Sequence, residues 1–556
     1  MKRLTQLVLV AAMVLALVSL ATAQEAPQVV GRVGNFIEVA PDVFMHIIAT
    51  GDWRYRTGHN WDFESRVQDR VQSRATNSTA VMGQECDCAH FQAHFGVDMR
   101  YRKELTFHLR FRHWQIYDAN IADDRSIATT PGGVDKFGRA ASAEGEPMNL
   151  QQAQINYAFP GTPVQLRLGW ELWFLDQAGI VSDNSPRAGV WFIQGPWEAH
   201  ASAVIQREAT RLGLTNDNDY IFYTFGAAYN LKPHRLQLDL AYFRDRFNGA
   251  PTGTTAGVDP SPPSTSGSRG ALPGFQGQKL DAVLIMPSWG GTFGPLAGLL
   301  QLYIMTGTAE SSTLAAVPGS KRNFDIFSAG LIAYAEANLG LVAPYVGMVY
   351  GTGDGDPTDT TLHGFHYLPN SAIAGTWTGT ARFSHLDRAV GLAGRDIKTP
   401  AGANRPNPNG VFGGDEFGHT VGSPFNDRLG NREHPGINTS LSNPGTITPF
   451  VGLKVFPVKG HEIVGTYLYR SMADATLLRL RLGVPISKAL YHGLHGQWQW
   501  TTSRHFDMRL AGGVVIPLEG LKDIARTSRA FPCTAANPCQ GDDPALWGEV
   551  RARVRF

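Results

Sequence analysis

The sequence lacks most of the features by which familiar classes of protein are recognised. Beyond its N-terminal segment it has no apolar run of about 18 residues, so no further helix is expected to cross a membrane. The formal net charge is only +1, which gives the molecule no strong attraction for nucleic acid. Neither a Gly-x-Ser-x-Gly elbow nor a Cys-x-x-Cys-His haem motif is present. We therefore expect a protein that is not an enzyme and that does not bind nucleic acid.

The first residues have the form of a secretory signal. Lys2 and Arg3 precede an apolar run over 7–20, and the small residues of 21–23 fit the cleavage pattern that follows such runs. We predict a signal peptide over residues 1–23, followed by an N-terminal periplasmic segment over residues 24–62. The alternative is a transmembrane helix, but the apolar run is short and polar sequence follows at once.

Glycine, proline and aromatic residues are abundant instead. The chain contains 61 glycines, 33 prolines and 10% aromatic residues, which suits many strands joined by turns. Apolar and polar residues alternate in many segments. In LTFHLRFRHW (105–114), for example, Leu105 and Phe107 share one face, and His108 and Arg110 share the other. Such segments predict strands with one apolar face each.

The length of these segments favours a membrane barrel over a soluble β-sandwich. They run for about 10 to 13 residues, which is enough to cross a bilayer at a tilt, whereas soluble strands are usually about 5 to 6 residues long. Many also carry Trp or Tyr towards their ends, where membrane barrels place aromatic girdles. We predict an all-β fold, a transmembrane antiparallel β-barrel of about 18 strands (16 to 20) over residues 63–556, in the outer membrane of a Gram-negative cell.

Short and long connections alternate along the chain, which predicts the orientation of the barrel. Tight turns are expected at 102–104, 160–163, 232–234 and 338–340, and long extracellular loops at 118–147, 248–276, 354–446 and 519–545. Two segments break the alternation: 44–56 is interpreted as preceding the barrel, and 476–484 as an external hairpin. Part of the long loop 354–446 is expected to fold back as a constriction, with an external, disordered loop as the alternative.

One stretch resembles a known family. In APYVGMVYGTGDGDPTDTTLHGFHYLP (343–369) a strand ends in a Gly-Asp element, Gly353-Asp354, and an acidic stretch and Phe365-His366 follow. This pattern is similar to the alginate-export family of outer-membrane barrels, as are residues 150–173 and HFDMRLAGGVVIPLEG (505–520). The chain departs from the family at Gly169-Trp170-Glu171. The resemblance implies an 18-stranded barrel whose basic lumen passes an anionic polymer.

If the apolar face of every strand meets lipid, the arginines of the other face must line the lumen. Arginine on the lipid face would cost about 2 to 4 kcal/mol at the midplane of the bilayer. The predicted lumen arginines are Arg66, Arg70, Arg74, Arg100, Arg102, Arg110, Arg112, Arg167, Arg235, Arg551, Arg553 and Arg555. They could form a basic wall that attracts anions, or they could pair with lumen acids such as Glu64, Asp98, Glu104, Glu171, Asp239 and Glu549.

Two further groups of residues could bind or crosslink. Asp354, Asp356 and Asp359 offer oxygen ligands for Ca²⁺, although their spacing is not that of an EF-hand and a solvated loop is the alternative. Of the four cysteines, Cys533 and Cys539 could form a local disulfide, or one of them could be linked to Cys86 or Cys88 on the neighbouring loop. No other cofactor is expected.

These features favour an outer-membrane channel, porin-like, that passes anionic or polar solutes through an arginine-lined lumen, with polysaccharide export as one version of that function. The alternative is a barrel that sheathes a periplasmic multihaem cytochrome, and an outer-membrane hydrolase is a third class. The expected partners are outer-membrane lipid, a periplasmic polysaccharide-export or cytochrome protein, and the outer-membrane assembly machinery. The last strand, which ends in Phe556, resembles the signal that this machinery recognises.

Overall fold

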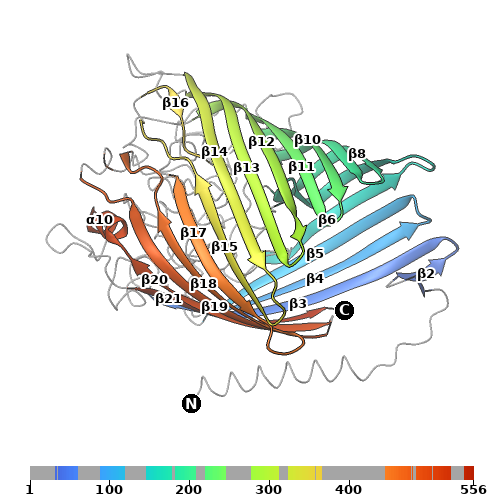
Figure 1. Cartoon of the computed structure of the whole chain (residues 1–556). Coiled ribbons are helices and arrows are strands. Elements are labelled where there is room, and N and C mark those ends of the chain that lie inside the picture. Colours follow the sequence, from blue (N-terminus) through green and yellow to red (C-terminus); the bar gives the residue numbers. More distant parts are fainter. Residues whose placement is uncertain are drawn as a thin grey trace.

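The structure is a computed structural model of the whole chain (Figure 1). It describes residues 32–33, 36–59, 88–118, 146–177, 182–207, 220–245, 277–311, 323–356, 359–365, 445–476, 479, 484–503, 505–527 and 544–555. None of the helices in these ranges is long and apolar enough to cross a membrane.

Eighteen of the described strands form one closed antiparallel ring (Figure 1). Each strand pairs with the next, and β21 pairs with β3 to close the sheet. The ring consists of β3 (Val43–His59), β4 (Cys88–Tyr101), β5 (Leu105–Asp118), β6 (Glu146–Ala158), β7 (Val164–Phe174), β8 (Ser182–Gln194), β9 (Trp197–Arg207), β10 (Tyr220–Leu231), β11 (His234–Asp245), β12 (Gly277–Phe293), β13 (Leu296–Ser311), β14 (Asn323–Ala337), β15 (Val342–Gly351), β17 (Thr446–Val455), β18 (His461–Ser471), β19 (Ala489–Ser503), β20 (Phe506–Pro517) and β21 (Ala545–Arg555).

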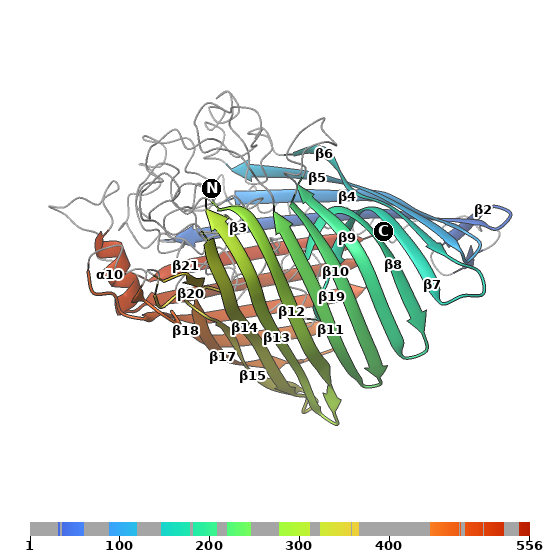
Figure 2. The same cartoon turned by 90° about the horizontal axis from the view of Figure 1, so that it is seen from above.

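Four short elements accompany the ring. Strands β1 (Arg32–Val33) and β2 (Phe36–Ala40) extend the sheet from the start of β3, and β16 (Thr361–Leu362) runs parallel to the start of β14. Helix α10 (Glu519–Thr527) follows β20. Figures 1 and 2 both place α10 and β2 at opposite ends of the barrel, which we call the long-loop end and the short-turn end.

The predicted alternation of short and long connections is confirmed. It places the short turns at one end of the barrel and the long connections at the other. The turns joining β4 to β5, β6 to β7, β10 to β11 and β14 to β15 span only a few residues, as predicted. The predicted long connections follow β5, β11, β15 and β20, which all run towards the long-loop end. Only residues 476, 479 and 484 of the segment 476–484 are described, between β18 and β19, so the predicted external hairpin stays a prediction.

The predicted start of the barrel is wrong. Strand β3 pairs with both β21 and β4, so it is the first strand of the ring, and the barrel begins well before residue 63. Residues 44–56 belong to this strand and do not precede the barrel. The alternation of β3 is interrupted by apolar Ile48 on the inward face, which hid the strand in the sequence.

The two faces of the sheet divide as the alternation predicts. Large apolar side chains stand exposed on the outside: 58% of Phe327, 56% of Val346 and 52% of Phe225 are accessible. Polar residues such as Gln301 and Thr448 are completely buried on the inside. A soluble protein buries its apolar faces, so this arrangement is the reverse of the one that water favours.

The interior is not polar all round. On β12 and β13 the inward residues Leu284, Met286 and Met305 are completely buried, and Tyr334 and Tyr345 continue this apolar side onto β14 and β15. Sequence alternation cannot reveal this, because the outward residues of these strands are apolar as well. The interior therefore has a polar side and an apolar side.

Candidate functional site

The inward arginines of the last strand lie where they were predicted, but each of them is paired. Arg551 makes two hydrogen bonds to Asp52, from Nε to Oδ1 at 2.9 Å and from Nη2 to Oδ2, and both side chains are buried. Arg553 Nε and Arg555 Nη2 both donate to Asp507 Oδ2, at 2.8 and 2.5 Å. Charges held in such contacts are not available as a bare basic wall.

Arginines elsewhere in the ring are held in the same way. Arg110 lies 3.3 Å from Asp98 Oδ2, and His108 Nδ1 lies 2.7 Å from Asp98 Oδ1. Arg235 Nη2 donates to Glu198 Oε2 at 2.8 Å. The prediction that Arg102 lines the lumen is wrong, because this residue lies in the turn between β4 and β5 and pairs with Asp42 in an exposed contact. The pairing of lumen arginines with lumen acids, which the sequence left open, therefore describes these residues best.

The structure gives side-chain contacts for only two of the remaining predicted arginines, Arg167 and Arg100. Arg167 Nη2 lies 3.5 Å from Gln165 Oε1, and its guanidinium lies 4.5 Å from the centre of the Trp191 ring. Arg100 Nε donates to the carbonyl of Arg102 at 2.8 Å. Arg112 lies on β5, but its side chain is outside the described part of the structure. Arg66, Arg70 and Arg74 fall in the connection between β3 and β4 and lie entirely outside the described residues.

Sequence reasoning missed most of the acids that hold these arginines. Asp98 was among the predicted partners, but Asp52, Asp507 and Glu198 were not. Asp52 lies in the segment that was assigned outside the barrel. Asp507 stands at an inward position directly across from Arg553, and this register could be read only once the two strands were paired.

The end of the β7–β8 hairpin leaves the wall of the barrel. Strand β7 pairs with β6 only as far as Trp170, and β8 pairs with β9 only from Arg187, while β7 and β8 stay paired up to residues 174 and 182. The residues that follow β7, Leu175 to Gln177, then contact inward side chains of β11, β12 and β13. We call residues 175–177 the lumen segment.

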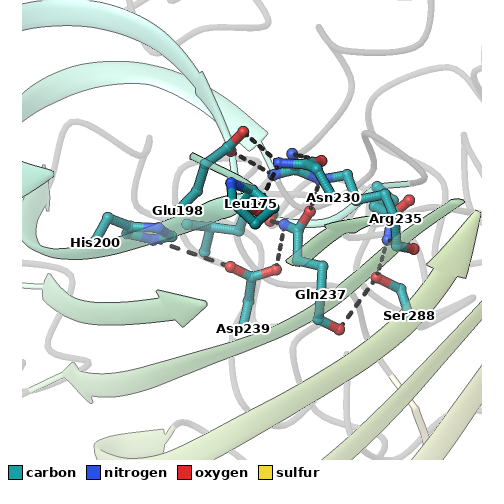
Figure 3. A network of polar contacts seen from close by, with 10 residues as sticks. Leu175, Glu198, His200, Asn230, Arg235, Gln237, Asp239 and Ser288 are labelled. Carbon is teal, nitrogen blue, oxygen red and sulfur yellow. Dashed lines mark hydrogen bonds and ion pairs between the residues drawn. The ribbon is translucent and has the colours of Figure 1, made fainter. Parts of the chain in front are cut away.

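Four hydrogen bonds attach the lumen segment to that wall, and Figure 3 shows Leu175 of this segment beside Gln237. Gln237 Nε2 donates to the carbonyl of Leu175 at 2.7 Å, and Tyr303 donates to Asp176 Oδ2 at 2.5 Å. Gln177 Nε2 donates to Ser288 Oγ at 2.9 Å and to the carbonyl of Arg235 at 3.2 Å. Because these partners face the inside of the ring, the lumen segment narrows the barrel interior.

A second segment also folds inwards. After β15, the chain returns so that the Phe365 backbone N–H donates to the Thr352 carbonyl at 2.8 Å. The ring of Phe365 lies against inward Gly330 and Gly351, and its centre is 5.7 Å from that of Tyr303. Within residues 352–356 and 359–365, the connection after β15 therefore returns so that Phe365 points into the barrel. A constriction formed by this loop stays a prediction. The rest of the predicted long loop lies outside the described residues.

A row of three inward residues lies beside the lumen segment. Gly226 on β10 stands between His200 on β9 and Asp239 on β11 in the strand register. A methyl group at Gly226 would come within 2.2 Å of His200 Cε1 and 2.3 Å of Asp239 Oδ1. The glycine therefore allows the imidazole and the carboxylate to approach across β10, with His200 Nε2 4.0 Å from Asp239 Oδ1.

Of the three candidate calcium ligands, Asp359 caps the backbone N–H of Thr361 at 2.7 Å and Asp354 is completely buried. Asp474, which is not one of the three, lies beside Gly355 and pairs with Lys488 at 3.3 Å. Burial alone would raise the pKa of Asp474, but hydrogen bonds from Thr476 and Lys488 bring this pKa below its ordinary value. Among the residues that the structure describes, no group of three or more acids, histidines or cysteines could hold a metal ion.

The cysteine prediction is not tested. Cys86, Cys533 and Cys539 lie outside the described residues, and only the backbone of Cys88 is described, at the start of β4. Pairing of β21 with β3 does make the connections that carry these cysteines neighbours around the ring, as predicted.

Comparison with known proteins gives remote structural likenesses only. No protein-family model matches the chain, and no curated protein matches its sequence. Among solved structures, Acinetobacter baumannii OccAB1 is 7% identical with a TM-score of 0.45, over 92% of this chain and 96% of that one. A BenF-like porin from Pseudomonas fluorescens Pf-5 is 9% identical with a TM-score of 0.43, over 92% and 99%. Pseudomonas aeruginosa OpdK with vanillate is 11% identical with a TM-score of 0.42, over 93% and 99%.

These identities and TM-scores are too low to assign the chain to a family. The resemblance to the alginate-export proteins likewise rests on the quoted residues alone. Any function must therefore be argued from the barrel itself.

Proposed function

We propose that the protein is an outer-membrane channel through which small polar solutes, anions included, diffuse without a chemical step. The observation that carries this proposal is the closed ring, which is apolar on its exposed face and largely polar within. A closed sheet leaves no unpaired backbone group facing hydrocarbon, and an apolar outer face is stable there but not in water. The orientation with long loops outside the cell is part of the proposal.

The contents of the barrel interior favour the passage of a small solute over the passage of a polysaccharide strand. The lumen segment and the segment around Phe365 both occupy space within the ring, and each reduces the width left for a solute. The paired arginines support only a weak preference for anions, because a guanidinium beside a carboxylate contributes little to the long-range field. We therefore favour small polar molecules that carry little net charge or a single negative charge.

Two partners belong to the proposal. Lipid would cover the exposed apolar face, and the assembly machinery of the outer membrane would recognise the last strand, β21. The sheath of a cytochrome conduit is the competing function. In that case a haem protein should co-purify with the barrel from its native membrane, and the isolated barrel should pass no solute.

Liposome swelling tests the proposal. Vesicles that contain the refolded full-length chain should swell in solutions of small neutral and anionic solutes such as glycerol and acetate. They should not swell in dextran. Heat-unfolded protein, added in the same amount, is the control. Vesicles that respond no faster than this control would show that the barrel is not a channel.

A further inference from the structure

Gln237 is the residue that connects the lumen segment to the charged groups of the interior. Its amide N–H groups donate to the carbonyl of Leu175 at 2.7 Å and to Asp239 Oδ2 at 2.6 Å, and its Oε1 accepts from Arg235 Nε at 2.9 Å (Figure 3). The same guanidinium bonds Glu198 and Asn230. One side chain thus joins the hairpin, a buried carboxylate and an ion pair.

These contacts determine where the side chain can lie. Because Asp239 is only 1% exposed and Arg235 is held by Glu198 and Asn230, neither partner can follow Gln237 if it moves. The amide is therefore fixed on two sides, and its remaining N–H points at the lumen segment. Buried polar groups that lose such partners are costly, so the arrangement should persist in the folded protein.

Two other side-chain contacts hold the lumen segment, one at Ser288 and one at Tyr303. Gln177 belongs to the segment itself and donates to Ser288 Oγ. This small hydroxyl in turn donates to the backbone carbonyl of Gln237 at 3.4 Å. Tyr303 reaches Asp176 from β13 through the end of a long side chain. Arg235 contributes only its backbone carbonyl to these contacts. Gln237 holds the segment with a side chain that is itself hydrogen-bonded to two charged side chains of the wall, Asp239 and Arg235.

We propose that Gln237 is the positioning residue that fixes how far the lumen segment enters the barrel, and that it thereby sets the size limit for solutes. This inference rests on the proposed channel function. The Arg235–Glu198 pair lies beside the same point, with about a third of each side chain exposed to the interior. A solute that passes the lumen segment would therefore meet a guanidinium and a carboxylate together.

The test compares Gln237→Met with a matched variant, Gln499→Met. Methionine keeps the length of glutamine but has no amide, and Gln499 is an inward glutamine on β19 whose only described hydrogen bond is to Thr501, at 3.4 Å. Gln237→Met should raise single-channel conductance by about twofold and admit larger sugars in liposome swelling, because the narrowest section controls both. Gln499→Met should keep the conductance and the size limit of the parent.

Crosslinking provides a readout that does not depend on transport. In a chain whose four native cysteines are replaced by Ser, Gln177→Cys and Ser288→Cys should form a disulfide on mild oxidation. The crosslinked yield should fall about fivefold or more when Gln237→Met is added, because the hydrogen bond to Leu175 and the two that anchor the amide to Asp239 and Arg235 are lost. Adding Gln499→Met should not change it.

Each outcome decides one part of the inference. If Gln237→Met keeps the parental yield, Gln237 does not position the segment. If the yield falls but the size limit stays, the segment does not set that limit. If the parent itself passes no solute, the proposed channel function fails, while the crosslinking result still decides the role of Gln237.

Discussion

At the scale of single residues, the main finding is that several inward arginines are paired with inward acids. The buried Asp52–Arg551 pair joins the first and last strands of the ring, with two hydrogen bonds between side chains that are less than a tenth exposed. Sequence alternation predicts that both side chains face inwards, but it cannot predict which acid meets which base. That depends on the register of strands that lie at opposite ends of the chain.

We expect Asp52→Asn to lower the free energy of unfolding by about 3 kcal/mol, because it removes the carboxylate charge that the buried Arg551 guanidinium contacts. The measurement is urea unfolding of the protein in lipid vesicles. Asp42→Asn is the control, since the Asp42–Arg102 pair is more than half exposed and should be worth less than about 1 kcal/mol. Equal effects of the two substitutions would contradict the burial of the Asp52 pair.

A second residue-scale prediction concerns Gly226. Gly226→Ala should destabilise the barrel by about 1 to 3 kcal/mol, because the new methyl group would push His200 and Asp239 apart. Gly465→Ala on β18 is the control, as no atom lies within 4 Å of a methyl group there. The measurement is the unfolding midpoint of each variant. A Gly226→Ala protein as stable as Gly465→Ala would contradict the close approach of His200 and Asp239 across β10.

At the scale of elements, the strands were more predictable than the segments that leave the wall. A period of two over ten or more residues identifies a strand directly, which is why most strands and their short turns agree with the sequence. Strand β3 was missed because Ile48 falls on its inward face. The inward bend after Trp170 has no such signal, since it depends on partners in β11 to β13 that are far away in the sequence.

The outward face gives a prediction about whole strands. Leu302 lies midway along β13, opposite Leu331 of β14, and is 38% exposed. Leu302→Arg should reduce the free energy of folding into vesicles by about 2 to 4 kcal/mol, because the charge would enter the middle of the bilayer. Leu339→Arg, in the turn between β14 and β15, should cost about 1 kcal/mol or less. A Leu302→Arg protein that folds as well as Leu339→Arg would contradict the lipid contact of this face.

At the scale of the whole molecule, the sequence predicts the barrel but not its interior. The alternation, the strand lengths and the alternating connections together indicate about 18 strands, and the ring has that number. The sequence left open whether the inward arginines form a basic wall or pair with acids. The structure pairs Arg110, Arg235, Arg551, Arg553 and Arg555 with acids. It also lines one side of the interior with apolar residues and brings two segments into the ring. All three features depend on contacts between distant parts of the chain.

The central claim is that a solute path runs through this barrel and that it is narrow and nearly neutral. Single-channel recording of the refolded full-length protein in a planar bilayer tests it most directly, with a KCl gradient to give the ion selectivity. We predict discrete, steady current steps with a reversal potential only slightly to the anion side of zero. Correctly folded protein that gives no current, or a current carried almost entirely by one sign of ion, would contradict the account.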